Sequence, residues 1–367
     1  MRPILTTIRI NMRSLPKITD PIFVKKELKG LDKFFVSKIR DERDLPFIYL
    51  MIKITFTLIP SAILLYSPLL TGNIWWAWAG FHLILCLAVF LGPYTLMLHN
   101  TSHRPFFKRD YNNWNKYIPW VLAPFMGQSP DLYFIHHMGM HHNEGNMPED
   151  KSSTMPFQRD SIFGFLHYYL RFLFIGVLEL AQYFFSKKRS SMGVQAARKE
   201  FSYWLFLGLM CTFVNLGATV AVFILPLIII RLAMMSGNWG QHAFVDPDEP
   251  NNDYKSSITC INSGYNRQCF NDGYHIGHHL VPNMHWTDMP VEFQENIQKY
   301  ADNQSLVFEG LDFQIVWFLL MIKRYDVLAK HLVNINGNTF ASDEEAIAIM
   351  KKRTKRFSKE RLAFYAQ

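Results

Sequence analysis

Two long stretches of the chain are almost free of charged residues, and they limit the folds that it can adopt. Residues 45–98 contain only Lys53 as a charged residue, and residues 201–239 contain only Arg231. Because a membrane-spanning helix needs about 20 apolar residues, the first stretch is long enough for two spans. The second stretch would measure roughly 58 Å as one helix, which also favours two spans. The sequence therefore predicts an all-α integral membrane protein with four transmembrane helices, at about 46–70, 74–98, 201–217 and 219–238.

Positive charge is concentrated at both ends of the chain. Residues 1–44 hold 11 Lys and Arg against 6 Asp and Glu, and residues 351–367 hold 7 against 1. Basic residues beside apolar spans are typical of the cytoplasmic membrane surface, so we expect no nucleic-acid partner. We expect a basic cytoplasmic N-terminal segment at 1–44 without a cleaved signal peptide. A membrane domain at 45–290 and a cytoplasmic helical region with a basic tail at 291–367 follow it.

Histidines form four short clusters, each near the end of an apolar stretch or in a polar segment between stretches. The clusters are HNTSH (His99, His103), HHMGMHH (His136, His137, His141, His142), NWGQH (Asn238, His242) and HIGHH (His275, His278, His279). A spacing of four residues puts two rings on one face of a helix. The four spans end on one membrane side near these clusters, which predicts a single site in a cytoplasmic helical cap.

Residues 161–185 have the length of a span but contain His167, Arg171 and Glu179, and a basic loop follows them. A fifth span here would place the HIGHH cluster on the opposite membrane side from the first two clusters. We therefore expect an interfacial or re-entrant helix.

Clustered histidines indicate a transition-metal site, because neutral imidazole is the commonest side-chain ligand of such metals. Spacing alone does not choose the metal, although the zinc-hydrolase pattern H-E-x-x-H and the Glu-x-x-His pattern of soluble di-iron bundles are absent. On a helix, His137 lies about 40° from His141 and His136 about 140°, which favours His137 as the ligand. Some residues near the clusters would orient the ligand rings by hydrogen bonds without binding the metal. The candidates for this role are His136, His285, Glu144 and Asp246.

The order of the four clusters resembles the histidine boxes of the membrane fatty acid desaturase superfamily, over roughly residues 90–290. The resemblance implies that two iron ions are held by His99, His103, His137, His141, His142, His242, His275, His278 and His279. It implies that Asn238 binds one iron through a water molecule, and that no side chain beyond the metal centre is catalytic. It also implies that dioxygen is the co-substrate and that a double bond is introduced into a fatty acyl chain bound to coenzyme A, a carrier or a lipid.

The resemblance has further implications for partners and location. Because no His-Pro-Gly-Gly haem motif is present, electrons would come from a separate cytochrome b5 or ferredoxin-type protein. The membrane would be a bacterial inner membrane or the endoplasmic reticulum. Two alternatives stay open: a membrane di-iron hydroxylase or ketolase of an alkane, sterol, sphingoid or carotenoid, and a metal transporter or metal-storing membrane protein.

Overall fold

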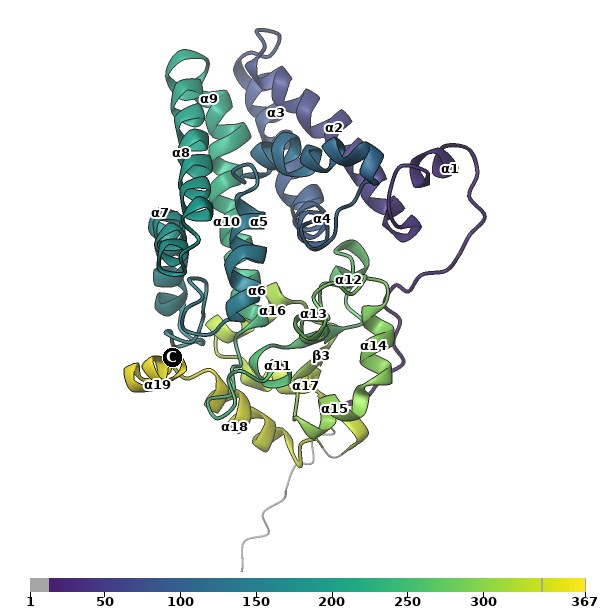
Figure 1. Ribbon diagram of the computed structural model, residues 1–367, viewed down its shortest axis with the longest axis vertical. Coiled ribbons are helices and arrows are strands. Elements are labelled where there is room, and N and C mark those ends of the chain that lie inside the picture. Colours follow the sequence, from purple (N-terminus) through teal and green to yellow (C-terminus); the bar gives the residue numbers. More distant parts are fainter. Residues whose placement is uncertain (1–12, 338, 367) are drawn as a thin grey trace, which may run out of the picture.

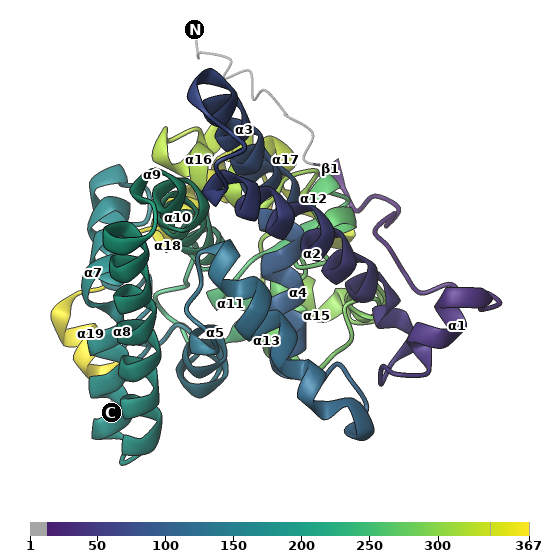
Figure 2. The ribbon, with the colours of Figure 1, turned by 90° about the horizontal axis from the view of Figure 1, so that it is seen from above.

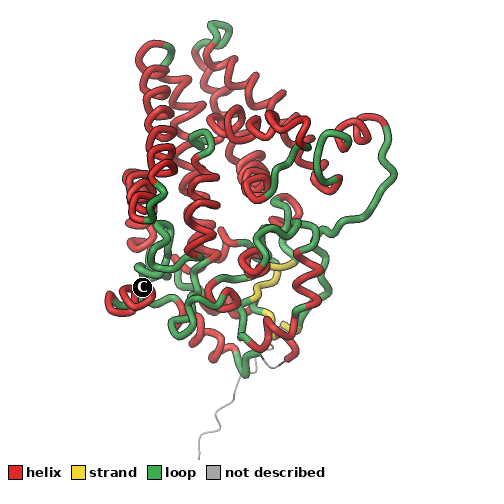
Figure 3. Tube along the Cα trace, in the orientation of Figure 1, coloured by secondary structure: helices red, strands yellow, loops and turns green. Residues whose placement is uncertain are grey.

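The computed structural model describes residues 13–337 and 339–366 of the chain (Figure 1). Residues 1–12 of the predicted N-terminal segment therefore lie outside the described residues. Helices dominate the described part, and short strands occur only in its lower half (Figure 3). The upper layer holds the long apolar helices, and the lower layer holds residues 242–366 together with the start of the described chain (Figure 1).

Four helical segments in the described residues are long and apolar enough to cross a membrane: Glu42–Tyr66, Gly72–His103, Ile162–Ser186 and Leu216–Gln241. Three of them coincide with the spans expected at 46–70, 74–98 and 219–238. They are built from α2 (Leu45–Tyr66), from α3 (Gly72–Ile84), η2 (Leu85–Phe90) and α4 (Leu91–His103), and from α9 (Leu216–Thr219), η7 (Val220–Ile224) and α10 (Leu225–Gln241).

The expected span at 201–217 needs correction. Residues 201–213 belong to a longer helix, α8 (Ser190–Phe213), which is not among the four segments and whose first half carries Arg198, Lys199 and Glu200. The helix starts earlier because no proline separates the polar residues from the apolar run. The predicted turn follows directly after it, where the Asn215 side chain accepts a hydrogen bond from the backbone N–H of Ala218 and caps α9.

Helix α7 (Ile162–Ser186) has the length and composition of a spanning helix, but its direction differs from that of α10. It is seen nearly end-on in Figure 1 and lengthwise in Figure 2, whereas α10 is lengthwise in Figure 1 and end-on in Figure 2. A helix that runs across the direction of a span suits the interfacial placement expected for 161–185, which stays a prediction.

Prolines and tryptophans shape the apolar helices. The wide π-turns η2 and η7 lie immediately before the turns that contain Pro93 and Pro226. A proline cannot donate the usual hydrogen bond to the previous turn, and a wider turn relieves its clash with that turn's carbonyl. The indole N–H of Trp75 donates to the carbonyl of Leu65 near the end of α2, at 2.9 Å. This bond satisfies a carbonyl that the ending helix leaves without a partner.

A second set of short helices connects α4 to α7 and carries one histidine cluster. It consists of η3 (Arg109–Lys116), η4 (Ile118–Leu122), η5 (Ala123–Met126), α5 (Leu132–His136), η6 (His137–His141) and α6 (His142–Glu144). Before α2, the chain forms α1 (Gly30–Val36) and η1 (Glu42–Asp44).

The lower layer is a helical cap with two small parallel sheets, which the sequence analysis did not predict. In one sheet β1 (Arg13–Ser14) pairs with β4 (Val333–Asn334), and in the other β2 (Thr259–Ile261) pairs with β3 (Val307–Glu309) in the register Cys260 to Phe308. The helices of the cap are α11 (Asp253–Ser256), α12 (Gly264–Gln268), α13 (His275–Leu280), α14 (Met289–Glu295), α15 (Ile297–Asp302), α16 (Phe313–Met321), α17 (Tyr325–His331), η8 (Ile335–Gly337), α18 (Asp343–Arg353) and α19 (Lys359–Tyr365).

The cap is anchored to the apolar layer by a close helix crossing. Gly240 of α10 lies against the backbone of Phe313 in α16, and a β-carbon at Gly240 would lie only 2.4 Å from the Phe313 carbonyl oxygen. Only glycine permits this approach. Gly240 is directly followed by Gln241 and His242, so the helix crossing also fixes the positions of these two polar residues at the end of α10.

Candidate metal centre

Nine of the predicted histidines converge where the apolar layer meets the cap. They come from α4, from η6 and the first residue of α6, from the residue after α10, and from α13. Their ring nitrogens form two separate groups rather than one. The structure thus brings together histidines up to 180 positions apart in the chain, as the sequence analysis expected for a single site.

The first group contains five rings, whose facing nitrogens all lie within 4.8 Å of one another. The Nε2 atoms of His99 and His278 are 3.0 Å apart, and those of His103 and His137 are 3.0 Å apart. The Nε2 atom of His142 lies 3.1 Å from that of His137 and 3.0 Å from that of His278.

The second group contains four rings. Nitrogen atoms of His141, His242 and His279 lie within 4.8 Å of one another. His275 joins them, because its Nε2 atom lies 3.2 Å from that of His242 and 3.1 Å from that of His279. Helix α13 therefore supplies rings to both groups: His278 to the first, and His275 and His279 to the second.

Both groups have the chemistry of metal ligands. Burial, together with the neighbouring rings, lowers the pKa of His142 to about 2 and that of His242 to about 3, so both rings are neutral at physiological pH. Burial also holds the pKa values of His137, His275 and His278 well below their usual range. A neutral ring offers a lone pair, which is the form that binds a metal ion.

The spacing of the nitrogens also fits coordination. Metal–imidazole bonds are about 2.1 Å long, so two of them at a right angle separate their nitrogens by about 3.0 Å, while a tetrahedral angle gives about 3.4 Å. The six Nε2 pairs described above are 3.0–3.2 Å apart. These separations allow several rings of one group to bind the same metal ion, and the chemistry of the two groups fits a pair of iron ions.

The HHMGMHH cluster divides between the two groups. Residues 132–144 are helical, but 137–141 form a π-turn. In a π-turn the hydrogen bonds run from i to i+5, so a residue faces the one five positions later. His142 accordingly pairs with His137, and His141 faces the second group. His136 is left outside both groups, with its ring parallel to that of His141 at 6.5 Å between centroids.

Three of the four residues expected to support the ligands have other partners. The Glu144 carboxylate accepts a hydrogen bond from the Tyr183 hydroxyl at 2.6 Å. Asp246 pairs with Arg353 at 2.9 Å. The Nε2 atom of His285 lies 3.0 Å from Asp44, in a buried cluster near the start of α2. Glu144, Asp246 and His285 therefore do not contact the clustered histidines through these bonds, although all three lie near a cluster in the sequence.

Three other acids lie beside the Nδ1 atoms of the clustered histidines, and the sequence analysis did not identify them. Asp150 accepts a hydrogen bond from the Nδ1 atom of His141 at 2.7 Å. Asp272 lies 3.6 Å from the Nδ1 atom of His99, and Asp253 lies 3.9 Å from that of His279. Asp150 comes nine residues after His141, and Asp272 three before His275. Closeness to a histidine cluster in the sequence, within ten residues, could have identified Asp150 and Asp272. The same criterion also identifies Glu144 and Asp246, which have other partners.

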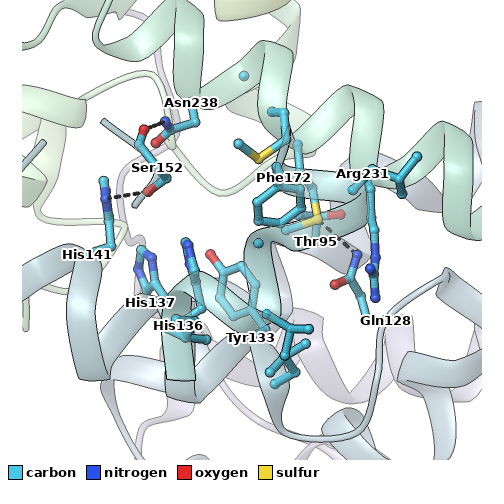
Figure 4. Close-up of a pocket in the computed structure, with 18 of the residues that line it drawn as sticks. Thr95, Gln128, Tyr133, His136, His137, His141, Ser152, Phe172, Arg231 and Asn238 are labelled. Atoms are coloured by element: carbon cyan, nitrogen blue, oxygen red, sulfur yellow. Dashed lines mark hydrogen bonds between the residues drawn. The ribbon is translucent and has the colours of Figure 1, made fainter. Parts of the chain in front are cut away.

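Asn238 lies near the second group, on the last turns of α10. Its amide nitrogen donates to the carbonyl of Ser152 at 3.0 Å and to the hydroxyl of Tyr168 at 2.7 Å. Because these bonds fix the nitrogen, the amide oxygen is the end that remains for another partner. Figure 4 shows Asn238 beside Ser152, opposite His141. That it binds iron through water stays a prediction.

A cavity of about 1,110 Å³ begins at the histidines and extends between α5, α7, α8 and α10. His99, His137, His141, His275 and Asn238 line its inner end. Most of the remaining lining is apolar, with residues such as Leu96, Phe172, Leu173, Val177 and Met235. Figure 4 shows Tyr133, His136 and His137 side by side along one wall of this cavity.

One wall of the cavity contains a buried ion pair. Arg231 of α10 donates to Glu200 of α8 at 2.8 and 3.0 Å, and Ser129 and Trp204 also donate to the Glu200 carboxylate. Every oxygen of Glu200 is therefore bonded. The pair joins α8 to α10, and Gln128 lies beside Arg231 in Figure 4.

The family model described as fatty acid desaturase matches residues 73–309, which is more than half of the chain. Neither a curated protein nor a solved structure matches it. The matched range contains all nine converging histidines and, except for Gly72, three of the four candidate spans. The chain therefore belongs to the fatty acid desaturase family.

Proposed function

We propose that this protein is a dioxygen-dependent di-iron desaturase that introduces a double bond into a fatty acyl chain. The observation that carries the proposal is the junction of two histidine groups with a long, mostly apolar cavity. A metal transporter would instead place its ligands near the middle of the membrane between spans. Here the rings lie at helix ends, where the apolar layer meets the cap.

The two groups would each hold one iron ion, with five rings for the first and four rings for the second. When bound, the irons supply the activation of dioxygen and the removal of two hydrogens from unactivated methylene groups, which no side chain can perform. Asp150 holds the Nδ1–H of His141, and the carbonyl of Ser256 accepts from the Nδ1 atom of His242 at 3.0 Å. Both contacts turn the Nε2 lone pair toward the group.

The cavity would position the acyl chain. An alkyl chain offers only dispersion contacts and apolar area, so its place is set by the shape of the wall. Leu96 and Met235 lie on α4 and α10, and Phe172 and Val177 lie on α7, so the wall comes from three different helices. Filling such a cavity also excludes water from the metals.

We further propose the cytoplasmic side for both termini and for the histidine groups. The basic ends of the chain and the basic segment 186–199 support this orientation. A separate cytochrome b5 or ferredoxin-type protein would then deliver electrons from the cytoplasm. The membrane would be a bacterial inner membrane or the endoplasmic reticulum.

The test is expression in a host whose fatty acid profile is known. Gas chromatography with location of the double bond should show a new unsaturated fatty acid, and the His278→Ala variant should not produce it. Purified protein should contain about two irons per chain. A new hydroxy or keto lipid would instead identify a hydroxylase or ketolase. A saturated, unmodified lipid pool with iron-replete protein and a working electron donor would contradict the proposal.

A further inference from the structure

The cavity does not end inside the protein. Its lining continues from the histidines onto side chains of α7 and α8 that are largely exposed. Phe174 and Leu178 of α7 expose 73% and 63% of their surface, and Phe201 of α8 exposes 69%. We use "rim" for these three residues together with Val194 and Arg198 of α8, which also line the cavity and are exposed.

The rim is suited to hydrocarbon rather than to water. Leaving a large apolar side chain in water costs roughly 1.5–3 kcal/mol relative to burying it. Helix α7 has the composition of a membrane helix, and only 17% of its apolar window is buried within the protein. The exposed faces of α7 and α8 therefore lie against lipid, and the cavity opens sideways into the bilayer.

Charge at the rim is limited to one residue. The charged residues of the cavity lining are Arg198, Glu200, Arg231 and Asp272. The last three are buried, and Glu200 and Arg231 bind each other. Arg198 is exposed, and within the described ranges 13–337 and 339–366 no carboxylate forms an ion pair with it.

The change from polar to apolar residues along α8 places Arg198 where the phosphate of a membrane lipid would lie. Arg198 lies four residues after Val194 and three before Phe201, so the three share one face of α8. It also lies at the end of the basic 186–199 segment, where α8 changes from polar to apolar. One guanidinium suits one phosphate, whereas the several phosphates of coenzyme A call for several cations.

We propose that the substrate is the acyl chain of an intact membrane phospholipid, which enters sideways through the rim while Arg198 binds the lipid phosphate. This inference rests on the proposed function, because it names the substrate class of the same site. The acyl chain then passes between α7 and α8 toward the histidines. The reaction uses the same dioxygen and electron donor as the proposed desaturation. Only the molecule to which the acyl chain is attached differs.

A photo-crosslinking experiment tests the binding without requiring turnover. Full-length, iron-loaded protein is placed in vesicles of phosphatidylethanolamine and phosphatidylglycerol that contain a phospholipid with a diazirine in its acyl chain. After irradiation, peptides from α7 and α8 should carry the lipid at Phe174, Leu178 or Phe201. A diazirine-labelled acyl-coenzyme A should not label these residues. Preferential labelling by the coenzyme A probe, or absence of lipid adducts at the rim, would overturn the inference.

Matched variants make the test specific. Ala197 lines the cavity beside Arg198, so Ala197→Trp should lower crosslinking at least tenfold. Leu205→Trp places the same ring on the same helix at a site that is 52% exposed and outside the lining, and it should crosslink normally. Arg198→Gln should lower crosslinking about tenfold, as expected from a charged hydrogen bond, while Arg198→Lys should largely restore it. Arg267→Gln removes another exposed cation, far along the chain on α12, and should have no effect.

Turnover separates this inference from the proposed function. With an isotope-labelled saturated chain in either carrier, mass spectrometry of early time points should find the double bond first in intact phospholipid. A double bond that appears first in acyl-coenzyme A would overturn the lipid inference and keep the desaturase. Rim crosslinks without any double bond would keep the lipid inference and contradict the desaturase.

Discussion

Replacing Asp150 with asparagine should weaken iron binding in the second histidine group while leaving the first group loaded. The Asp150 side chain is fully buried, and each of its oxygens accepts two hydrogen bonds. Oδ2 accepts from His141 at 2.7 Å and from the N–H of Asn146 at 3.2 Å. Oδ1 accepts from the N–H and the hydroxyl of Ser152 at 2.7 and 2.6 Å.

The magnitude follows from these four contacts. Although burial pushes it upward, the His141 ring and the Ser152 bonds hold the pKa of Asp150 below its usual value, so the group is a carboxylate at neutral pH. In Asp150→Asn the amide nitrogen fits best at the Oδ1 position, because the Ser152 hydroxyl can rotate to accept while the Ser152 N–H loses its partner. One unpaired buried N–H costs about 1–3 kcal/mol of the free energy of unfolding. Loss of the charge behind a ligand ring costs about 10–100-fold in metal affinity or activity.

The assay is retention of iron against a graded chelator, measured by elemental analysis together with product formation. Wild-type protein should keep about two irons per chain, and Asp150→Asn should lose one at a 10–100-fold lower chelator concentration. Glu144→Gln is the matched control, since Glu144 is bound by Tyr183 instead of a histidine and should retain both irons. Equal release of both irons from Asp150→Asn, or release identical to that of the wild type, would refute the assignment of Asp150 to His141.

Three further outcomes are expected. His137→Ala should lose iron from the first group and all activity, while His136→Ala should keep both irons and lose only part of the activity, as measured by iron content and product formation. Arg231→Ala should lower the free energy of unfolding by about 3–5 kcal/mol, because it leaves Glu200 buried without its partner; Arg231→Met combined with Glu200→Gln should cost less in chemical denaturation. Reporter fusions after residues 72 and 192 should report the far side and the cytoplasmic side respectively, and a far-side signal at 192 would contradict the topology.

Much of the metal centre could be predicted from the sequence, because its residues are grouped in short clusters. The spacing of HNTSH puts His99 and His103 on one face of α4, and both rings lie in the first group, whereas the spacing of HIGHH does not indicate that its rings divide between the two groups. The division of His137, His141 and His142 between the two groups was not predicted, because a π-turn changes the facing pair from i, i+4 to i, i+5. No residue pattern in this segment signals that turn.

Contacts across long sequence separations could not be predicted in the same way. Glu200 reads as one acid in a basic loop, and Arg231 as a lone charge inside a span, yet the fold pairs them at 2.8 Å. The start of α8 was hidden for a related reason: the hydropathy pattern changes at Phe201, but the backbone hydrogen bonds continue from Ser190. Hydropathy reports the environment of a residue, and helix boundaries depend on capping and on proline, so the two need not coincide.

The distribution of ligands between the groups has a consequence for stability. Helix α13 has six residues, too few to be stable alone, yet it supplies rings to both groups. In the first group its partners include α4 of the apolar layer, and in the second they include His242 at the end of α10. Each metal ion would therefore join the cap to the membrane helices through α13. A neutral ring nitrogen either donates one hydrogen bond or accepts one, so Nε2 atoms that each face two others, such as those of His142 and His275, cannot all be satisfied by one another. Metal binding thus supplies the attraction that the rings lack, and it couples the fold of the cap to the assembly of the site.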